Sequence, residues 1–145
     1  MSPMNQRGKI LHPDRARQIN DFSGLLYGKI TPTDLDGVIE YHGKAYVFLE
    51  IKYDNTELPL GQKIAIERLV KDTSNGGKKS IAIIAEHNVF NTKENIPVAE
   101  CDVRQVYLYC EKRWREPKTQ INVKQCIDGF IKHVDKKNNK FANTS

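Results

Sequence analysis

The chain is poor in cysteine and has no long hydrophobic run. Its 145 residues include only Cys101, Cys110 and Cys126, with no Cys-x-x-Cys pair. Because an odd number of cysteines cannot all pair within one chain, the sequence predicts a reducing, cytoplasmic setting with the thiols as small core residues. No stretch approaches the ~20 apolar residues of a membrane span, and the segment MSPMNQRGKI lacks the apolar centre of a signal peptide. We therefore expect no membrane partner.

Charged residues are ordinary in number, but basic residues outnumber acidic ones. Charged residues make up 28% of the chain and hydrophobic residues 39%, as in many globular proteins, and the formal net charge is +5. A basic excess mildly favours a polyanionic partner such as nucleic acid. Composition along the chain predicts a basic flexible arm at residues 1–12, one domain at 13–135 and a disordered tail at 136–145.

A β-hairpin is the clearest local prediction. Residues 38–41 and 45–53 are rich in β-branched and aromatic side chains, and the segment His42-Gly43-Lys44 separates them as a turn of three residues. Side chains alternate between the two faces of a strand, so odd-numbered positions share one face. That face is continuously apolar and is expected to meet the core: Ile39, Tyr41, Val47, Leu49 and Ile51.

Acidic residues gather where the two hairpin strands end farthest from the turn. A three-residue turn sets Asp36 opposite Glu50 and Asp34 opposite Lys52. Directly opposed side chains lie about 4.5–5.5 Å apart at Cβ. Two carboxylates at that separation repel each other unless a cation lies between them. Mg²⁺ and Mn²⁺ are suited to such a corner, because they bind oxygen and take one or two carboxylates together with water and phosphate.

The same residues resemble a known motif. Asp36, followed after thirteen residues by Glu50-Ile51-Lys52, resembles the signature of the PD-(D/E)xK nucleases. The resemblance implies that Asp36 and Glu50 bind the divalent cation, and that the backbone carbonyl of Ile51 adds a ligand. It further implies that Lys52 orients or activates the attacking water.

The motif departs from the family pattern at its start, because Pro32 lies two residues before Asp34 and no Pro-Asp dipeptide is present. Either Asp34 or Asp36 is therefore a candidate first ligand, and the hairpin register favours Asp36. An exposed strand of alternating charged and apolar residues would produce the same string. The order of the predicted elements supports the nuclease interpretation.

The predicted elements alternate between helix and strand. Their order resembles the αβββαβ core of the restriction-endonuclease-like fold, an α/β class with a mixed central sheet flanked by helices, here with an extra C-terminal strand and helix. Besides the hairpin, the expected elements are a helix at 13–22, a strand at 29–31, a helix at 60–72, a buried strand at 81–85, a strand at 98–109 and a helix at 119–134.

Accessory site residues are predicted from two helices. In the resembling family an acid of the first helix sometimes completes the metal site, and Asp21 or Asp14 could serve, although a solvated acid gives the same pattern. Gln62 falls in the first turn of the second helix, where several related nucleases place a Gln or Glu near the site.

Two basic clusters are candidates for binding nucleic acid. Lys78 and Lys79 follow a glycine turn, and Arg113 and Arg115 flank the chain's one tryptophan, Trp114. Guanidinium groups pair with phosphate, and aromatic rings stack on bases. The competing interpretation is a Trp114 ring packed on the domain, with the neighbouring charges in water.

Taken together, the residues and the resemblance predict a metal-dependent nuclease, a hydrolase of phosphodiester bonds that requires Mg²⁺ or Mn²⁺. DNA is favoured over RNA as the substrate. In its compact size the chain resembles phage-type and junction-resolving endonucleases, and this resemblance implies a homodimer. The alternatives are a non-catalytic nucleic-acid-binding module and a protein-binding adaptor on the same fold.

Overall fold

The computed structural model of the chain describes residues 7–144, and for residues 137–144 it describes the course of the backbone without the side chains. The chain divides into two compact units, Met1–Thr33 and Asp34–Ser145. This boundary differs from the expected division between a basic arm at 1–12 and a domain beginning at residue 13. Residues 1–6 of the expected arm lie outside the described part of the chain.

The first unit holds one short helix, α1 (Pro13–Arg17), with Pro at its start and no buried residue. The helix was expected to reach Phe22, but Asn20 Nδ2 donates to the Arg17 carbonyl oxygen at 2.7 Å and the chain leaves the helix there. The strand expected at 29–31 is absent. Its place is taken by a tight turn, in which Tyr27 and Ile30 exchange backbone hydrogen bonds of 3.0 Å.

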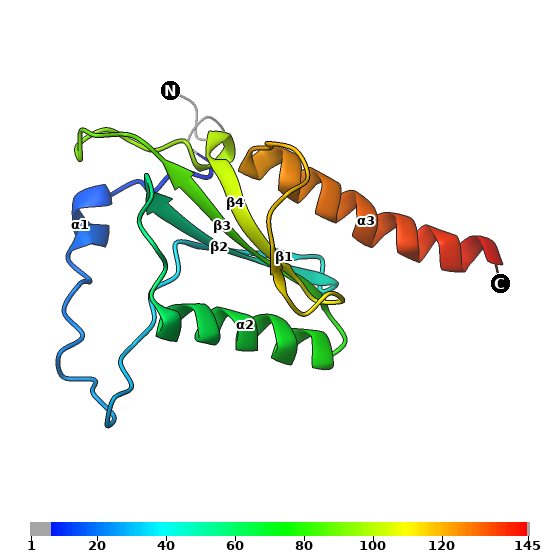
Figure 1. The fold of residues 1–145 in the computed structure, drawn as a ribbon, viewed down its shortest axis with the longest axis horizontal. Coiled ribbons are helices and arrows are strands. Elements are labelled where there is room, and N and C mark those ends of the chain that lie inside the picture. The colour runs from blue at the N-terminus through cyan, green and yellow to red at the C-terminus, as the bar shows by residue number, and fades with distance from the viewer. Residues whose placement is uncertain (1–6, 145) are drawn as a thin grey trace. The chain divides into compact units, whose positions relative to one another are not determined.

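The second unit is a mixed α/β structure built on a five-stranded sheet of order β1-β2-β3-β4-β5. The β2 and β3 strands are parallel, and every other neighbouring pair is antiparallel. Figure 1 shows α2 and α3 on opposite sides of this sheet. The bounds are β1 Gly37–Tyr41, β2 Ala45–Tyr53, α2 Leu60–Asn75, β3 Lys79–His87, the 3₁₀ turn η2 Val98–Glu100, β4 Asp102–Leu108, β5 Trp114–Arg115 and α3 Val123–Thr144.

The predicted hairpin and its register are confirmed. Tyr41 pairs with Ala45 and Gly37 pairs with Leu49, as a turn of three residues requires. His42 and Gly43 adopt positive φ angles of 50° and 70°, which suits glycine at the second position. The ladder ends at Gly37, the residue that follows Asp36, so the acidic corner lies just beyond the paired part of β1.

The two helices bury different faces of the sheet. The odd-numbered face of β1 and β2 packs under α3, in a cluster that includes Val47, Leu49 and Phe130. The even-numbered face packs against α2 through Phe48 and Ile66. This division confirms the predicted apolar face of the hairpin.

The helix α2 extends three residues beyond its predicted end at Asp72. The Thr73 hydroxyl donates to the Leu69 carbonyl at 2.7 Å, and the Ser74 hydroxyl bonds the Val70 carbonyl, so these side chains bond within the helix. Two leucines of α2 lie outside the core, because Leu60 is 73% exposed and Leu69 is 36% exposed.

The helix α3 begins at Val123, later than the predicted residue 119. Asn122 and Gln125 form a reciprocal cap, in which each side chain bonds the backbone N–H of the other at 2.8–2.9 Å. The helix continues to Thr144, through the segment for which the sequence predicted a disordered tail. Across residues 7–144, no helix is both long and apolar enough to cross a membrane.

Candidate active site

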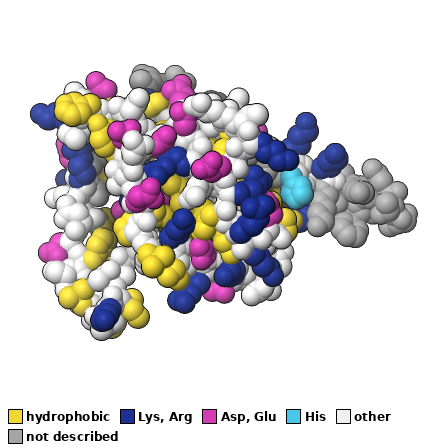
Figure 2. Space-filling view, viewed as in Figure 1, with side chains coloured by type: hydrophobic (Ala, Val, Ile, Leu, Met, Phe, Trp, Pro, Cys, Tyr) yellow, Lys and Arg dark blue, Asp and Glu magenta, His cyan; other side chains and the backbone are white. Residues whose placement is uncertain are grey.

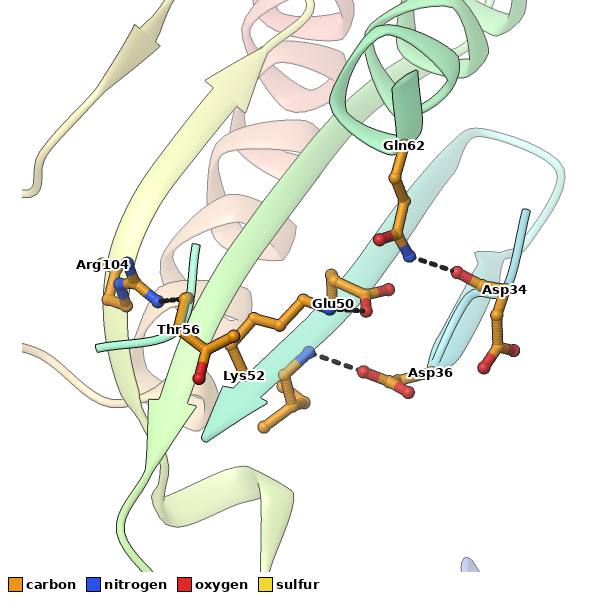
Figure 3. A network of polar contacts seen from close by, with 8 residues as sticks. Asp34, Asp36, Glu50, Lys52, Thr56, Gln62 and Arg104 are labelled. Carbon is orange, nitrogen blue, oxygen red and sulfur yellow. Dashed lines mark hydrogen bonds and ion pairs between the residues drawn. The ribbon is translucent and has the colours of Figure 1, made fainter. Parts of the chain in front are cut away.

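The acidic corner forms where β1 begins and β2 nears its carboxyl end. The Asp36 backbone N–H donates to the Leu49 carbonyl at 3.2 Å. Its carboxylate oxygen Oδ2 accepts the backbone N–H of Ile51 at 2.7 Å, so the side chain lies across the edge of β2 (Figure 3). The Asp36 carboxylate therefore contacts the residue that follows Glu50, and its charge acts on the Glu50 carboxylate.

The backbone of Ile51 faces the open edge beyond β1. Its N–H bonds the Asp36 side chain rather than a strand residue, because the β1 ladder has already ended at Gly37. The N–H and C=O of one strand residue point to the same side of the strand. The Ile51 carbonyl is thereby directed toward the edge that carries Asp36, where the resemblance places a metal ligand.

Glu50 is a buried carboxylate with one unsatisfied oxygen. Its exposed fraction is 5%, and its Oε1 lies 3.5 Å from the Lys52 ammonium. Its Oε2 is buried and has no hydrogen-bond partner among the described residues. The pKa of Glu50 is raised to about 7, mainly by burial and next by the nearby Asp36 carboxylate, while Lys52 acts in the opposite direction. A buried acceptor without a donor is costly, so this oxygen is poised for a cation.

The raised pKa of Glu50 predicts a pH dependence of stability. The folded protein binds this proton more tightly than the unfolded chain, whose carboxyl has the ordinary pKa of 4.5. The stabilisation is complete below about pH 4.5 and is lost as the pH rises through about 7, a change of about 3 kcal/mol. Glu50→Gln lacks the titration, so the variant should gain stability relative to the wild type between about pH 5 and pH 8.

Urea unfolding of the wild type and of Glu50→Gln at about pH 5 and pH 8, without divalent metal, measures the difference in their free energies of unfolding. Other titrating groups cancel in the comparison because both proteins carry them. An equal stability difference at both pH values would show that Glu50 titrates normally.

The accessory candidates lie in different places. Gln62, in the first turn of α2, donates its Nε2–H to the Asp34 backbone carbonyl at 2.7 Å, so the amide fixes the segment that leads into β1. The Asp34 side chain is exposed, and its charge contributes to the raised pKa of Glu50. Asp21 belongs to the first unit, where its carboxylate accepts the Ser23 N–H at 3.1 Å. Asp14 is in the same unit and pairs with Arg17 at 3.4 Å.

The donor set fits a hard divalent cation that keeps much of its water. Within residues 7–144, no group of three His, Cys, Asp or Glu side chains gathers closely enough to hold a metal by itself. Mg²⁺ does not need such a cage, because one or two carboxylates, water and substrate phosphate suffice. Asp36, the unsatisfied Oε2 of Glu50 and the Ile51 carbonyl are consistent with that requirement.

The Trp114 ring is packed on the domain, which confirms that part of the competing interpretation of the cluster. The Trp114 Nε1–H donates to Glu67 at 2.6 Å, and its ring centroid lies 5.3 Å from that of Tyr107. The Lys63 ammonium lies 5.2 Å from the centre of the Trp114 ring. Lys63 and Glu67, which lie one turn apart on α2, therefore both contact Trp114.

The arginines beside it are held by one carboxylate. Arg115 Nε contacts both oxygens of Glu111 at 2.8 and 2.9 Å. Arg113, with a 68% exposed side chain, lies 3.8 Å from the same carboxylate. In the glycine turn, the Lys78 ammonium bonds the Gly43 carbonyl, and the Lys79 backbone N–H bonds the Lys44 carbonyl. Among the cations predicted to contact nucleic acid beside Trp114, Arg113 is the more exposed one.

Two residues beside the corner could not be predicted from the sequence. Glu86 is the register partner of Lys52 in the parallel pair of β2 and β3. Arg104, on β4, lies 3.7 Å from Glu86 and donates to the Thr56 carbonyl at 2.8 Å. No local signal marks either residue, because their approach depends on how β3 pairs with both of its neighbours.

Comparisons of the chain with protein-family models, with curated proteins and with solved structures found no match. A function is therefore inferred from the residues of the site.

Proposed function

We propose that this protein is a divalent-metal-dependent nuclease that hydrolyses phosphodiester bonds at the corner formed by Asp36, Glu50 and Lys52. The observation that carries the proposal is the buried, unpartnered Oε2 of Glu50. It lies in a carboxylate whose other oxygen meets Lys52 at 3.5 Å, next to the second acid, Asp36. A residue that served only stability would be expected to have both oxygens satisfied.

The residues present would hold Mg²⁺ or Mn²⁺ through the carboxylates of Asp36 and Glu50 and through the Ile51 carbonyl. The bound cation would supply charge stabilisation for the phosphate oxygens that become more negative in the transition state. Asp36 is held in place for this role by the Ile51 N–H at 2.7 Å.

Lys52 would orient the attacking water beside the phosphate. Its ammonium is fixed by Glu50 at 3.5 Å, and its side chain is 21% exposed, so it is both positioned and open to a small ligand. An ammonium at that place also favours the approach of an anionic phosphate. Ionised Glu50 is the form that binds a cation, so activity should rise with pH through about 7.

The arrangement of elements supports the same assignment. A hairpin followed by a helix and a strand parallel to β2 corresponds to the central part of a restriction-endonuclease-like core. The carboxyl ends of the parallel strands β2 and β3 lie together, and in α/β sheets such ends commonly border the ligand site. We assign this core as the fold on which the nuclease site is built.

DNA is the substrate class that we propose, with a homodimer as the expected assembly by resemblance to compact nucleases. The net charge of +5 favours a polyanion. Figure 2 shows Lys and Arg side chains gathering toward α3, with carboxylates among the cations elsewhere on the same face.

Cleavage of a labelled panel tests the proposal. The panel holds linear, single-stranded, nicked and branched DNA together with RNA, each with Mg²⁺, Mn²⁺ or EDTA, and Glu50→Ala is assayed in parallel. We expect metal-dependent cleavage that the variant loses. Salt-dependent binding without cleavage would instead indicate a non-catalytic nucleic-acid-binding module, and the absence of binding would indicate a protein-binding adaptor.

A further inference from the structure

Lys52 has two carboxylates within reach on one face of the sheet. Glu50 precedes it by two residues on β2, and Glu86 is its register partner on β3. Register partners on adjacent strands share a face and lie about 4.8 Å apart along the hydrogen-bonding direction. The ammonium nevertheless meets Glu50, at 3.5 Å. Glu86 is the more exposed of the two acids, with 34% of its side chain accessible.

Arg104 contacts Glu86 from the side opposite to Lys52. Its Nε lies 3.7 Å from a Glu86 oxygen, and its other two nitrogens reach the Thr56 carbonyl at 2.8 Å and the Glu57 carboxylate at 3.6 Å. Figure 3 shows Arg104 on β4, across β3 from Lys52, while the Lys52 side chain extends away from it toward Glu50.

A β-bulge aims Arg104 at this position. The β3–β4 register pairs Ile84 with Gln105 and Ala85 with Val103, which leaves Arg104 as the extra residue of β4. Bulges re-aim a side chain and are frequent beside functional sites. The Arg104 side chain is 22% exposed, so most of its surface is covered by the protein.

We infer that Arg104 is a positioning residue: it engages Glu86, and this keeps the Lys52 ammonium on Glu50 at the acidic corner. The inference rests on the proposed function, since the position of Lys52 matters for turnover only if Lys52 acts on the substrate. Without Arg104, Glu86 would compete with Glu50 for the same ammonium.

Two other roles for Arg104 give different results. A direct contact with substrate phosphate would make its loss weaken substrate binding whatever residue 86 is. A tether for the loop after β2, through the Thr56 carbonyl and Glu57, would likewise not depend on the charge of Glu86.

The kinetic test compares the wild type, Arg104→Gln and the double variant Arg104→Gln/Glu86→Gln on the DNA that the wild type cleaves. We expect Arg104→Gln to lower kcat between about tenfold and a hundredfold with little change in KM, the usual scale for losing a residue that orients a functional group. The double variant should recover to within about threefold of the wild type. Lys71→Gln removes an exposed cation of α2 and serves as the matched control.

Crystal structures of Arg104→Gln and of the double variant give a readout that does not need cleavage. We expect the Lys52 ammonium on Glu86 in the single variant and back on Glu50 in the double variant. Three results would overturn the inference. These are a raised KM with unchanged kcat in Arg104→Gln, a double variant as slow as the single one, and a Lys52 ammonium that still contacts Glu50 in the Arg104→Gln structure. A wild type that cuts nothing would refute the proposed nuclease function. The two structures would still show whether Arg104 determines which carboxylate the Lys52 ammonium contacts.

Discussion

Replacing Glu50 by Gln should lower metal-dependent cleavage by about a thousandfold, the scale seen when a charge-stabilising group is removed from an active site. The amide retains the size of the side chain but cannot offer a negatively charged oxygen to a cation. Because Glu50 is 5% exposed and one of its oxygens has no partner, the variant should fold at least as well as the wild type near pH 8. Single-turnover cleavage rates under excess enzyme measure the effect.

Glu40→Gln is the matched control for that experiment. Glu40 is an exposed carboxylate on β1 of the same hairpin, and its side chain accepts the Gly43 backbone N–H, which the Gln oxygen can still accept. Both variants lose one negative charge, so a general effect of charge on DNA binding appears in both. Equal losses in the two variants would remove Glu50 from the site.

Replacing Lys52 by Met should lower the cleavage rate by a similar factor, about a thousandfold, while DNA binding stays within about threefold of the wild type. The thioether side chain preserves much of the packing but removes the ammonium that lies 3.5 Å from Glu50. Loss of that charge also raises the pKa of Glu50 further, because Lys52 lowers it in the wild type. The pH at which residual activity appears should therefore move upward.

Lys71→Met supplies the comparison for Lys52→Met. Lys71 is exposed on α2, so its loss changes the net charge equally without touching the acidic corner. We expect its turnover number to stay near that of the wild type. Full turnover in Lys52→Met, or a parallel loss of cleavage in both lysine variants, would contradict the role given to Lys52.

The acidic corner could be predicted because its geometry is local. A turn of three residues determines which residues face each other across a hairpin, and the observed pair of Tyr41 with Ala45 leads directly to Asp36 beside Glu50. Alternation along the strands likewise identified the apolar face that packs under α3. These inferences needed only short-range spacing.

The misses have physical causes of two kinds. One kind had a readable signal: Asn122 with Gln125 is a capping pair, and it predicts the start of α3 at Val123. The other kind depends on pairing between distant segments. The Trp114 contact with Glu67 and the bulge that directs Arg104 to Glu86 arise only after β4 and β5 join the sheet.

The first measurement to make is the binding of Mn²⁺ at about pH 8, where Glu50 is mostly ionised, followed through the electron paramagnetic resonance signal of free Mn²⁺. The wild type and Glu50→Gln are titrated side by side without nucleic acid. We expect the wild type to take up Mn²⁺ and Glu50→Gln to lose that uptake, as required if Glu50 and Asp36 hold the cation. Identical binding curves for the two proteins would contradict a metal site at this corner.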